Sequence, residues 1–432
     1  MGTAVLATAL VGLVSAPVAA AQPPTSPASS TPFTTPNTDS CPNKTAPPKA
    51  IDLSEVPAPG EPAPTPLPVS DHPIGGDDLG ACGVVTPDGS PALPPDISAT
   101  AWQVSDLDTG KVLAAKDPHG RYRPASTIKV LLAIVALREL DLDTVVVGTT
   151  EDADVDGTLV GIGPGGHYTN RQLMQALVMA SGNDAAHALA AQLGGNEATV
   201  AKMNAVAAEL GARDTRAATP SGLDGPGMST SAYDLSLVFR AAMTIPTFAE
   251  LIHTEQVEFP GFPADPRIPD DSADEPRDHP PFPIGNDNQL LYDYDGALGG
   301  KTGYTDDARQ TFVAGAERDG RRLAVTLLAA DVLPIRPWEQ AARLLDYGFA
   351  LDKDQSIGVL VSPAPTTGEV PRSPGWTDRA PLAAPPPDTR ARDVPAGDDT
   401  DHELMRIAVV LGGSVVVLLL VIAAAASSRR RR

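Results

Sequence analysis

The longest apolar run in the central part of the chain is Val130 to Leu137, which directly follows the hexapeptide Pro124 to Lys129. A run that is apolar on every face is typical of a helix buried on all sides. If this helix begins at the hexapeptide, the i, i+3 spacing places Ser126 and Lys129 on one face of its first turn. The pattern therefore predicts a serine hydroxyl and a lysine amine side by side, where burial favours the neutral amine.

Helical periodicity continues through the middle of the chain. Thr169 to Gln172 is a capping box, and the apolar residues after it recur every three to four positions. Gly194, Gly195 and Gly211 punctuate the later segments, as expected at helix ends. The pattern predicts a helical subdomain with helices starting at Thr169 and spanning Asp184 to Leu193, Glu197 to Leu210, and Ser231 to Met243.

Strand-like segments lie on both sides of this helical part. The turn Asp106 to Gly110 is flanked by two short β-prone segments, and Arg318 to Gly320 joins two more. Because tight turns connect antiparallel strands, we expect an antiparallel sheet flanked by helices, an α/β (α+β) fold. The expected strands are Ala101 to Val104, Lys111 to Ala115, Ala297 to Thr302, Thr311 to Glu317 and Arg321 to Ala330, and Trp338 to Phe349 is an amphipathic helix.

The segment from Phe259 to Asn286 interrupts these patterns. It is rich in proline and acidic residues, and regular patterning resumes after it. We interpret it as a long surface loop, and its place just before the strand at Ala297 makes it a candidate lid.

Composition favours one folded domain with several extensions, because 45 prolines and 38 glycines among the 432 residues indicate that much of the length is linker. The only two cysteines, Cys41 and Cys82, favour a disulfide over a metal site in an exported chain. The predicted parts are a signal peptide at 1–21, a Pro/Ser/Thr-rich disordered spacer at 22–90, the catalytic domain at 91–356, a Pro-rich tether at 357–403, a transmembrane helix at 404–426 and a cytoplasmic arginine tail at 427–432.

Charge and the C-terminal segment narrow the compartment and the partners. The net charge of -22 speaks against a nucleic-acid partner, since neutralising phosphates needs a basic surface. Ile407 to Ala426 carries no charge and is followed by Arg429 to Arg432, which the positive-inside rule keeps cytoplasmic. We therefore expect a single-pass cell-membrane protein with its catalytic domain on the cell-wall side.

Three short motifs stand in order along the folded region: Ser126-Thr127-Ile128-Lys129, Ser181-Gly182-Asn183 and Lys301-Thr302-Gly303. Each is weak alone, but the ordered set on a helix start, an interhelical loop and a strand is specific. The chain resembles the penicillin-binding, active-site-serine D,D-peptidases, and among them the low-molecular-mass D-alanyl-D-alanine carboxypeptidases of peptidase S11 type. The resemblance covers roughly residues 95 to 350 and implies the β-lactamase/D,D-peptidase-like fold.

The resemblance also implies roles for matching residues. Ser126 would attack the D-Ala-D-Ala carbonyl of a peptidoglycan stem peptide, Lys129 would take its proton, and Ser181 would relay a proton to the leaving amine. The expected substrate-binding residues are Asn183, Lys301, Thr302, Gly303 and Tyr304, with the oxyanion hole formed by the amides of Ser126 and Tyr304. β-Lactams would be covalent inhibitors, and no cofactor or metal is expected.

Arginine and histidine candidates beside the motifs have plainer interpretations. Arg309 is a candidate carboxylate ligand but is interpreted more simply as a surface arginine, and His187 as a packed or capping residue. Thr219 to Leu223 departs from the family's usual Asn-Pro-His-Gly-Leu, which leaves fine substrate preference open.

Two other functions remain as alternatives. A β-lactamase on the same fold needs an added carboxylate, usually in E-x-x-x-N, and neither Glu197 nor Glu209 lies in that pattern. A non-catalytic cell-wall anchor would not need all three motifs. A Ser-His-Asp hydrolase is disfavoured because no G-x-S-x-G occurs. The pattern leaves open whether the enzyme also cuts or forms cross-links, and its oligomeric state.

Overall fold

The computed structural model describes residues 35–265, 267–268 and 277–361. The predicted signal peptide, most of the tether, the transmembrane helix and the arginine tail lie outside these residues, and so does the first part of the predicted spacer. Among the described helices, none is by itself long and apolar enough to cross a membrane; one bent pair, Ala232–Met243 with Pro246–His253, passes by length and composition only.

The centre of the fold is a seven-stranded sheet in which every paired neighbour runs antiparallel, as predicted. Its order is β1-β3-β2-β10-β9-β8, with β11 pairing to β3. The strands are β1 (Val84–Val85), β2 (Ala101–Asp106), β3 (Lys111–Lys116), β8 (Ala297–Thr305), β9 (Arg309–Arg318), β10 (Arg321–Ala330) and β11 (Gly358–Val359). β11 extends the folded part past the predicted boundary at 356.

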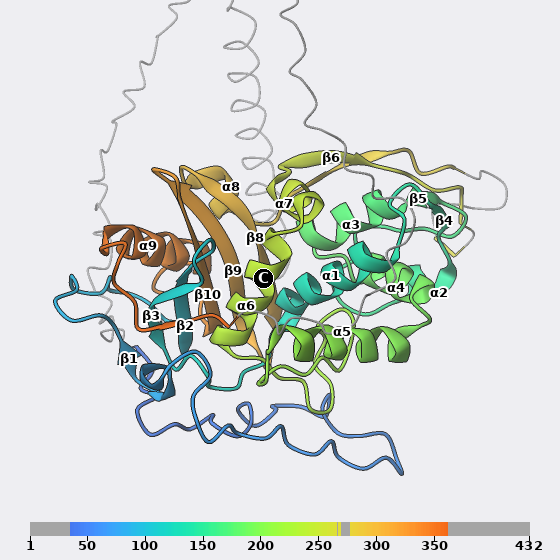
Figure 1. Ribbon diagram of the computed structural model, residues 1–432. Coiled ribbons are helices and arrows are strands. Elements are labelled where there is room, and N and C mark those ends of the chain that lie inside the picture. Colours follow the sequence, from blue (N-terminus) through green and yellow to red (C-terminus); the bar gives the residue numbers. More distant parts are fainter. Residues whose placement is uncertain (1–34, 266, 269–276, 362–432) are drawn as a thin grey trace, which may run out of the picture. The chain divides into compact units, whose positions relative to one another are not determined.

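Helices cover both faces of this sheet (Figure 1). On one face, α9 (Pro337–Ala350) and α8 (Leu290–Asp293) enclose a core with Trp102, Phe312 and Leu344. On the other face, α6 (Ala232–Met243) joins the sheet to the helical body. Because both faces are covered, β10 is buried along nearly all of its length.

The helical body contains the second core, and its local signals agree with the sequence. The Thr169 hydroxyl accepts from the Gln172 amide at 3.2 Å, which confirms the predicted capping box. The Ser231 hydroxyl caps α6 in the same way through the Asp234 amide. The remaining helices are α1 (Lys129–Glu139), α2 (Thr150–Ala153), α3 (Asn170–Met179), α4 (Asn183–Gln192), α5 (Asn196–Leu210) and α7 (Pro246–His253), with 3₁₀ turns η1 (Asp77–Gly80) and η2 (Ala125–Ile128).

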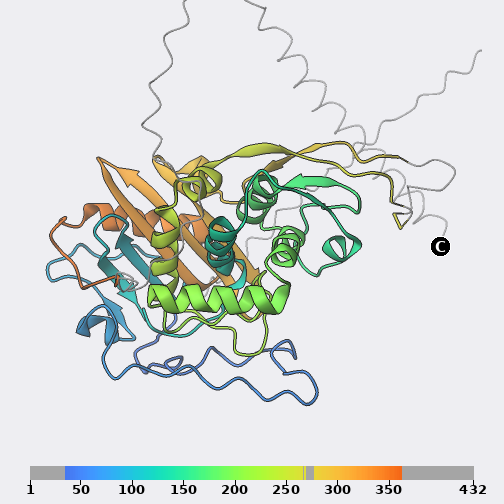
Figure 2. The same ribbon diagram turned by 45° about the vertical axis from the view of Figure 1, so that its right-hand side comes forward.

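Residues 35–90, here called the strap, contradict the prediction of a disordered spacer. They run along one edge of the domain (Figures 1 and 2) and are closed by a Cys41–Cys82 disulfide. The buried Arg121 donates to the carbonyls of Thr45, Leu67 and Pro68 at 2.7 to 2.8 Å. Composition alone was misleading because the strap is fixed by hydrogen bonds to its backbone rather than by an apolar core of its own.

The strap also reaches the catalytic domain near its motifs. Glu55 accepts two hydrogen bonds from the buried guanidinium of Arg123, at 2.6 and 2.8 Å. The amide of Ile51 donates to Asp307, in the turn between β8 and β9, at 2.7 Å. The strap therefore braces two segments that flank the first and third motifs.

The predicted loop at 259–286 is partly a two-stranded ribbon, β6 (Gln256–Phe259) with β7 (Phe282–Gly285). It packs near β5 (His167–Thr169), which pairs with β4 (Val145–Val147), because the rings of Tyr168 and Phe259 stack with centroids 5.3 Å apart. Part of the segment lies outside the described residues, so its interpretation as a lid stays a prediction.

Candidate active site

The first motif forms the turn η2 immediately before α1. Ala125 has φ of 47°, a strained value for a residue with a side chain, and a Cβ at Gly222 would lie 2.1 Å from the Ala125 carbonyl oxygen. The loop carrying Gly222 therefore packs directly against the turn. The side chain of Ser126 stays partly exposed although every residue next to it in sequence is buried.

Lys129 is the first residue of α1 and is fully buried. Its Nζ donates three hydrogen bonds, each 2.7 Å long, to Ser126 Oγ, Asn183 Oδ1 and the Ser221 carbonyl. An ammonium group has three hydrogens, so these partners use all of them. The contact with Ser126 is the pairing that the i, i+3 spacing predicts.

The pKa of Lys129 is lowered well below its ordinary value, first by burial and then by the positive charge of Lys301. Asp287 and Asp184 act in the opposite direction. A lysine with a lowered pKa supplies a neutral amine nearer physiological pH, which is the form that accepts a proton from a serine.

The second motif lies at the junction of α3 and α4. Asn183 begins α4, and besides accepting from Lys129 it donates from Nδ2 to the Asp156 carbonyl at 2.7 Å. Ser181 is buried with φ of 61°, and its hydroxyl forms no hydrogen bond with another described residue. The structure thus joins Asn183 to the lysine, while the proton relay through Ser181 stays a prediction.

The third motif lies on β8. A Cβ at Gly303 would come within 2.8 Å of the Ser126 amide nitrogen and 2.4 Å of Thr311 Oγ1, so only glycine allows the strand to approach the serine turn this closely. Thr311 in turn donates to the Pro124 carbonyl at 2.7 Å. Tyr304, one residue further, has an exposed ring whose hydroxyl donates to Asp306.

Lys301 and Thr302 share an acidic partner that motif matching did not single out. Asp287 accepts from Thr302 Oγ1 at 2.8 Å and from Lys301 Nζ at 3.4 Å. Burial lowers the pKa of Lys301, and Asp287 acts against that shift. Asp287 lies inside the sequence stretch Asn286 to Leu291, but nothing in its spacing indicates a contact with β8.

Arg336 is a second residue that sequence reasoning missed. A cavity of about 270 Å³ is lined by Asp287, Thr302, Arg336 and Trp338 among others. Arg336 forms no ion pair with any described carboxylate, whereas Arg309 donates to Asp331 at 2.8 Å and is paired. The structure therefore supports the surface interpretation of Arg309.

His187 is paired rather than free. Its Nδ1 lies 2.6 Å from Asp152 Oδ1, which agrees with a packed residue. Together with Asn183, Glu197 and Asp156 it lines a cavity of about 490 Å³. Neither Glu197 nor Asp156 forms a side-chain hydrogen bond with Ser126 or Lys129.

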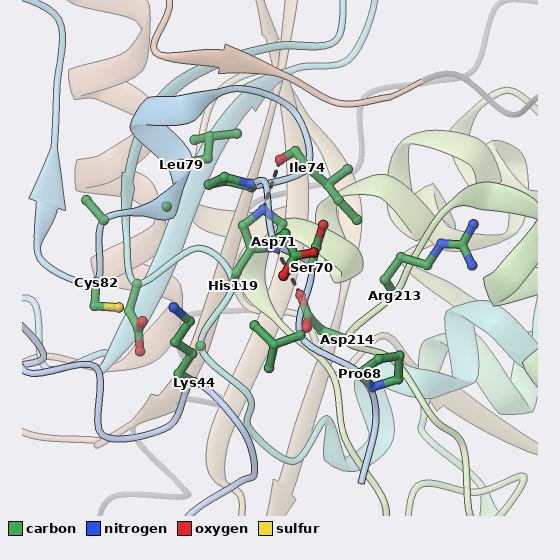
Figure 3. A pocket seen from close by; sticks show the side chains of 16 residues that line it. Lys44, Pro68, Ser70, Asp71, Ile74, Leu79, Cys82, His119, Arg213 and Asp214 are labelled. Carbon is green, nitrogen blue, oxygen red and sulfur yellow. Dashed lines mark hydrogen bonds and ion pairs between the residues drawn. The ribbon is translucent and has the colours of Figure 1, made fainter.

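A separate cavity of about 110 Å³ lies between the strap and the domain (Figure 3). The ring of His119 bridges the two, with Nε2 2.9 Å from the Ile74 carbonyl and Nδ1 2.9 Å from Asp214. With Asp234 these side chains come close enough to suggest a metal site, yet both ring nitrogens of His119 are already engaged. We interpret this group as a structural contact that holds the strap against the domain.

Comparison with known proteins gives a consistent result. The family profile described as D-alanyl-D-alanine carboxypeptidase, peptidase S11, matches residues 89–332. The chain is 50% identical over 280 residues to D-alanyl-D-alanine carboxypeptidase DacB2 of Mycobacterium tuberculosis, covering 64% of this chain and 90% of that protein. It is 32% identical over 251 residues to D-alanyl-D-alanine carboxypeptidase DacF of Bacillus subtilis, covering 57% and 60%.

Solved structures extend the similarity to the fold. A D-alanyl-D-alanine carboxypeptidase from Mycobacterium tuberculosis superposes with a TM-score of 0.58 at 48% identity, and the superposition covers 64% of this chain and 100% of that chain. A DD-transpeptidase from Streptomyces gives a TM-score of 0.55 at 28% identity, covering 60% and 100%. The strap lies almost entirely before the segment that the family profile matches.

Proposed function

The chain belongs to the D-alanyl-D-alanine carboxypeptidase family of serine peptidases, and from that premise we propose that it removes the terminal D-alanine from peptidoglycan stem pentapeptides through an acyl-enzyme on Ser126. The observation that carries the proposal is the 2.7 Å hydrogen bond between Ser126 Oγ and the fully buried amine of Lys129. This pair supplies a nucleophile together with a base whose charged form is disfavoured.

The reaction proceeds in two steps. In the first, neutral Lys129 accepts the hydroxyl proton while Ser126 Oγ bonds to the carbonyl carbon, with the amides of Ser126 and Tyr304 as oxyanion donors. The C–N bond then breaks, and the leaving amine of D-alanine receives a proton through Ser181. In the second step, water attacks the ester and releases the shortened peptide and Ser126.

The terminal carboxylate of the substrate is assigned to the cavity beside β8. Thr302 supplies a hydroxyl there, and Lys301 supplies a buried positive charge behind it. Arg336 adds a guanidinium that is free of ion pairs within the described residues, and its planar fork of donors suits a carboxylate better than an ammonium does. A free carboxylate at the end of the donor is the feature that a carboxypeptidase must recognise.

The direct test is release of D-alanine by the full-length chain from a pentapeptide ending in D-Ala-D-Ala. We expect one equivalent of D-alanine for each tetrapeptide formed. A parallel incubation with a cross-linked peptide dimer measures endopeptidase activity. Absence of D-alanine release from the pentapeptide, with intact folded protein, would contradict the proposal.

We expect β-lactams to remain attached rather than to be turned over quickly. The opened ring stays bound to Ser126 and obstructs the approach of water. Glu197 and Asp156, which line the cavity beside Asn183, form no side-chain hydrogen bond with Ser126 or Lys129. Deacylation therefore lacks general-base assistance of about 10² to 10⁴. After incubation with benzylpenicillin and removal of the excess, intact mass should show the adduct outlasting the peptide intermediate by orders of magnitude. Recovery of the unmodified mass within seconds would instead favour a β-lactamase.

We further propose that the catalytic domain works outside the cell membrane, held by the apolar segment 404–426 on the tether 357–403. Support comes from sequence alone: a 20-residue uncharged run followed by four arginines. A chain that ends at residue 403 should appear in the soluble fraction with unchanged turnover on small peptides, because every catalytic group proposed above lies before β11. Loss of activity in the shortened chain, or its persistence in the membrane fraction, would contradict this placement.

A further inference from the structure

The loop that carries Asp287 is held rigidly beside the catalytic groups. Asn286 Nδ2 donates to the carbonyls of Ile252 and Thr254 at 3.2 and 3.0 Å. The amide of Asp287 itself donates to the Met179 carbonyl, at the end of α3, at 2.8 Å. Because these bonds hold Asn286 and the backbone amide of Asp287, the Asp287 carboxylate leaves β8 chiefly by rotation of its own side chain.

The carboxylate of Asp287 binds the groups that the proposed function assigns to the substrate. Its Oδ2 accepts from Thr302 Oγ1 at 2.8 Å and lies 3.4 Å from Lys301 Nζ. Its Oδ1 forms no hydrogen bond with another described residue, and the side chain is 34% exposed. An internal carboxylate thus occupies one hydroxyl and one ammonium that would otherwise meet a substrate carboxylate.

A second carboxylate at this position meets a like charge. The Thr302 hydroxyl has one hydrogen to donate, so it cannot serve Asp287 and the substrate together. Lys301 is already paired with Asp287, and Arg336, the cation that lines the cavity, forms no ion pair with any carboxylate of the described residues. The carboxylate of the donor must therefore bind near Arg336. Asp287 either rotates away from it or repels it.

We propose that Asp287 is a specificity-determining residue that occupies the carboxylate position on Lys301 and Thr302 and thereby weakens binding of donors that end in a free carboxylate. The inference rests on the proposed function, since it takes Thr302 as the ligand of the terminal carboxylate. Donors in which that carboxylate is masked by an ester or an amide do not experience the repulsion. The preference of the site for a free carboxylate over a masked one is therefore smaller than it would be without the aspartate.

Asp287 also acts on the base. Burial and Lys301 lower the pKa of Lys129, whereas the negative charges of Asp287 and Asp184 raise it. Removing the charge of Asp287 leaves the two lowering influences and one raising influence. Lys129 then loses its proton at a lower pH, so the acid limb of the pH–rate profile moves to lower pH.

The test compares Asp287→Asn with the wild-type full-length chain. Asparagine keeps the size of the side chain and an oxygen that accepts from Thr302, and it removes the charge. The second-order rate constants of acylation are measured with benzylpenicillin, which carries a free carboxylate, and with its methyl ester, which does not. We expect the ratio of acid to ester to rise about tenfold in the variant, and the acid limb of acylation to move to lower pH.

Matched variants keep the result interpretable. Asp319→Asn removes an exposed carboxylate from the distant β9–β10 turn and should leave the ratio at the wild-type value. Asp287→Ser removes the charge in a smaller side chain and should reproduce the rise, which covers any folding defect of the asparagine variant. An unchanged ratio in folded Asp287→Asn and Asp287→Ser, or a slower reaction of the acid alone, would overturn the inference.

The outcomes also separate this inference from the function on which it rests. If the wild-type chain is acylated by benzylpenicillin but the ratio does not respond to Asp287, only the role of Asp287 is wrong. If the folded wild-type chain is acylated by neither compound, the acyl-enzyme proposal is wrong and the role of Asp287 is overturned with it.

Discussion

Ser126→Ala is expected to abolish both D-alanine release and covalent labelling by penicillin. Ser126 Oγ lies 2.7 Å from the buried amine of Lys129. The Thr302 hydroxyl contacts the buried Lys301 only at 3.4 Å and donates its hydrogen to Asp287. Ser126 is therefore the hydroxyl placed to form the acyl bond. We expect kcat/KM to fall by at least about 10⁴, so that only the rate acceleration provided by substrate binding and the oxyanion hole remains. Intact mass after incubation with benzylpenicillin measures the labelling directly.

The fold should tolerate this change, because Ser126 is partly exposed and its replacement removes one oxygen atom. A thermal unfolding midpoint close to that of the wild-type chain is the control. Labelling that persists in the folded variant would place the nucleophile at another residue and would remove Ser126 from the mechanism.

Lys129→Ala is expected to reduce acylation by several orders of magnitude. The serine loses the base 2.7 Å from its oxygen, and Asn183 loses the donor that orients it. General-base catalysis alone contributes about 10² to 10⁴, and the loss of orientation adds to it. The rate of acylation by benzylpenicillin, followed against pH, is the measurement.

The pH dependence gives this prediction a second readout. In the wild-type chain the neutral lysine is the reactive form, so acylation should rise with pH as Lys129 loses its proton, and its lowered pKa brings that rise below the range of an ordinary lysine. The alanine variant should lack this limb. Near-wild-type rates, or the same limb in folded Lys129→Ala, would exclude lysine as the base.

Features that depend on neighbours in the chain were predictable. Ser126 and Lys129 are three residues apart, so helical geometry alone sets their contact. The capping box at Thr169 and the tight turns of the sheet follow from equally short spacings, and all three motifs lie where the sequence placed them. The Ser181 relay and the oxyanion amides had no such local signature beyond the family resemblance.

Contacts between distant segments were decided by the tertiary structure alone. Lys129 meets Asn183 and Ser221 across 54 and 92 residues, and Asp287 meets Thr302 across 15. The strap looked disordered because its composition lacks an apolar core, yet the buried Arg121, more than 50 residues away, donates to three of its carbonyls. The sequence by itself determined which groups carry the chemistry, since short spacings fix local geometry. The tertiary structure decided which charges surround them, because those neighbours come from the packing of remote segments, which no local pattern encodes.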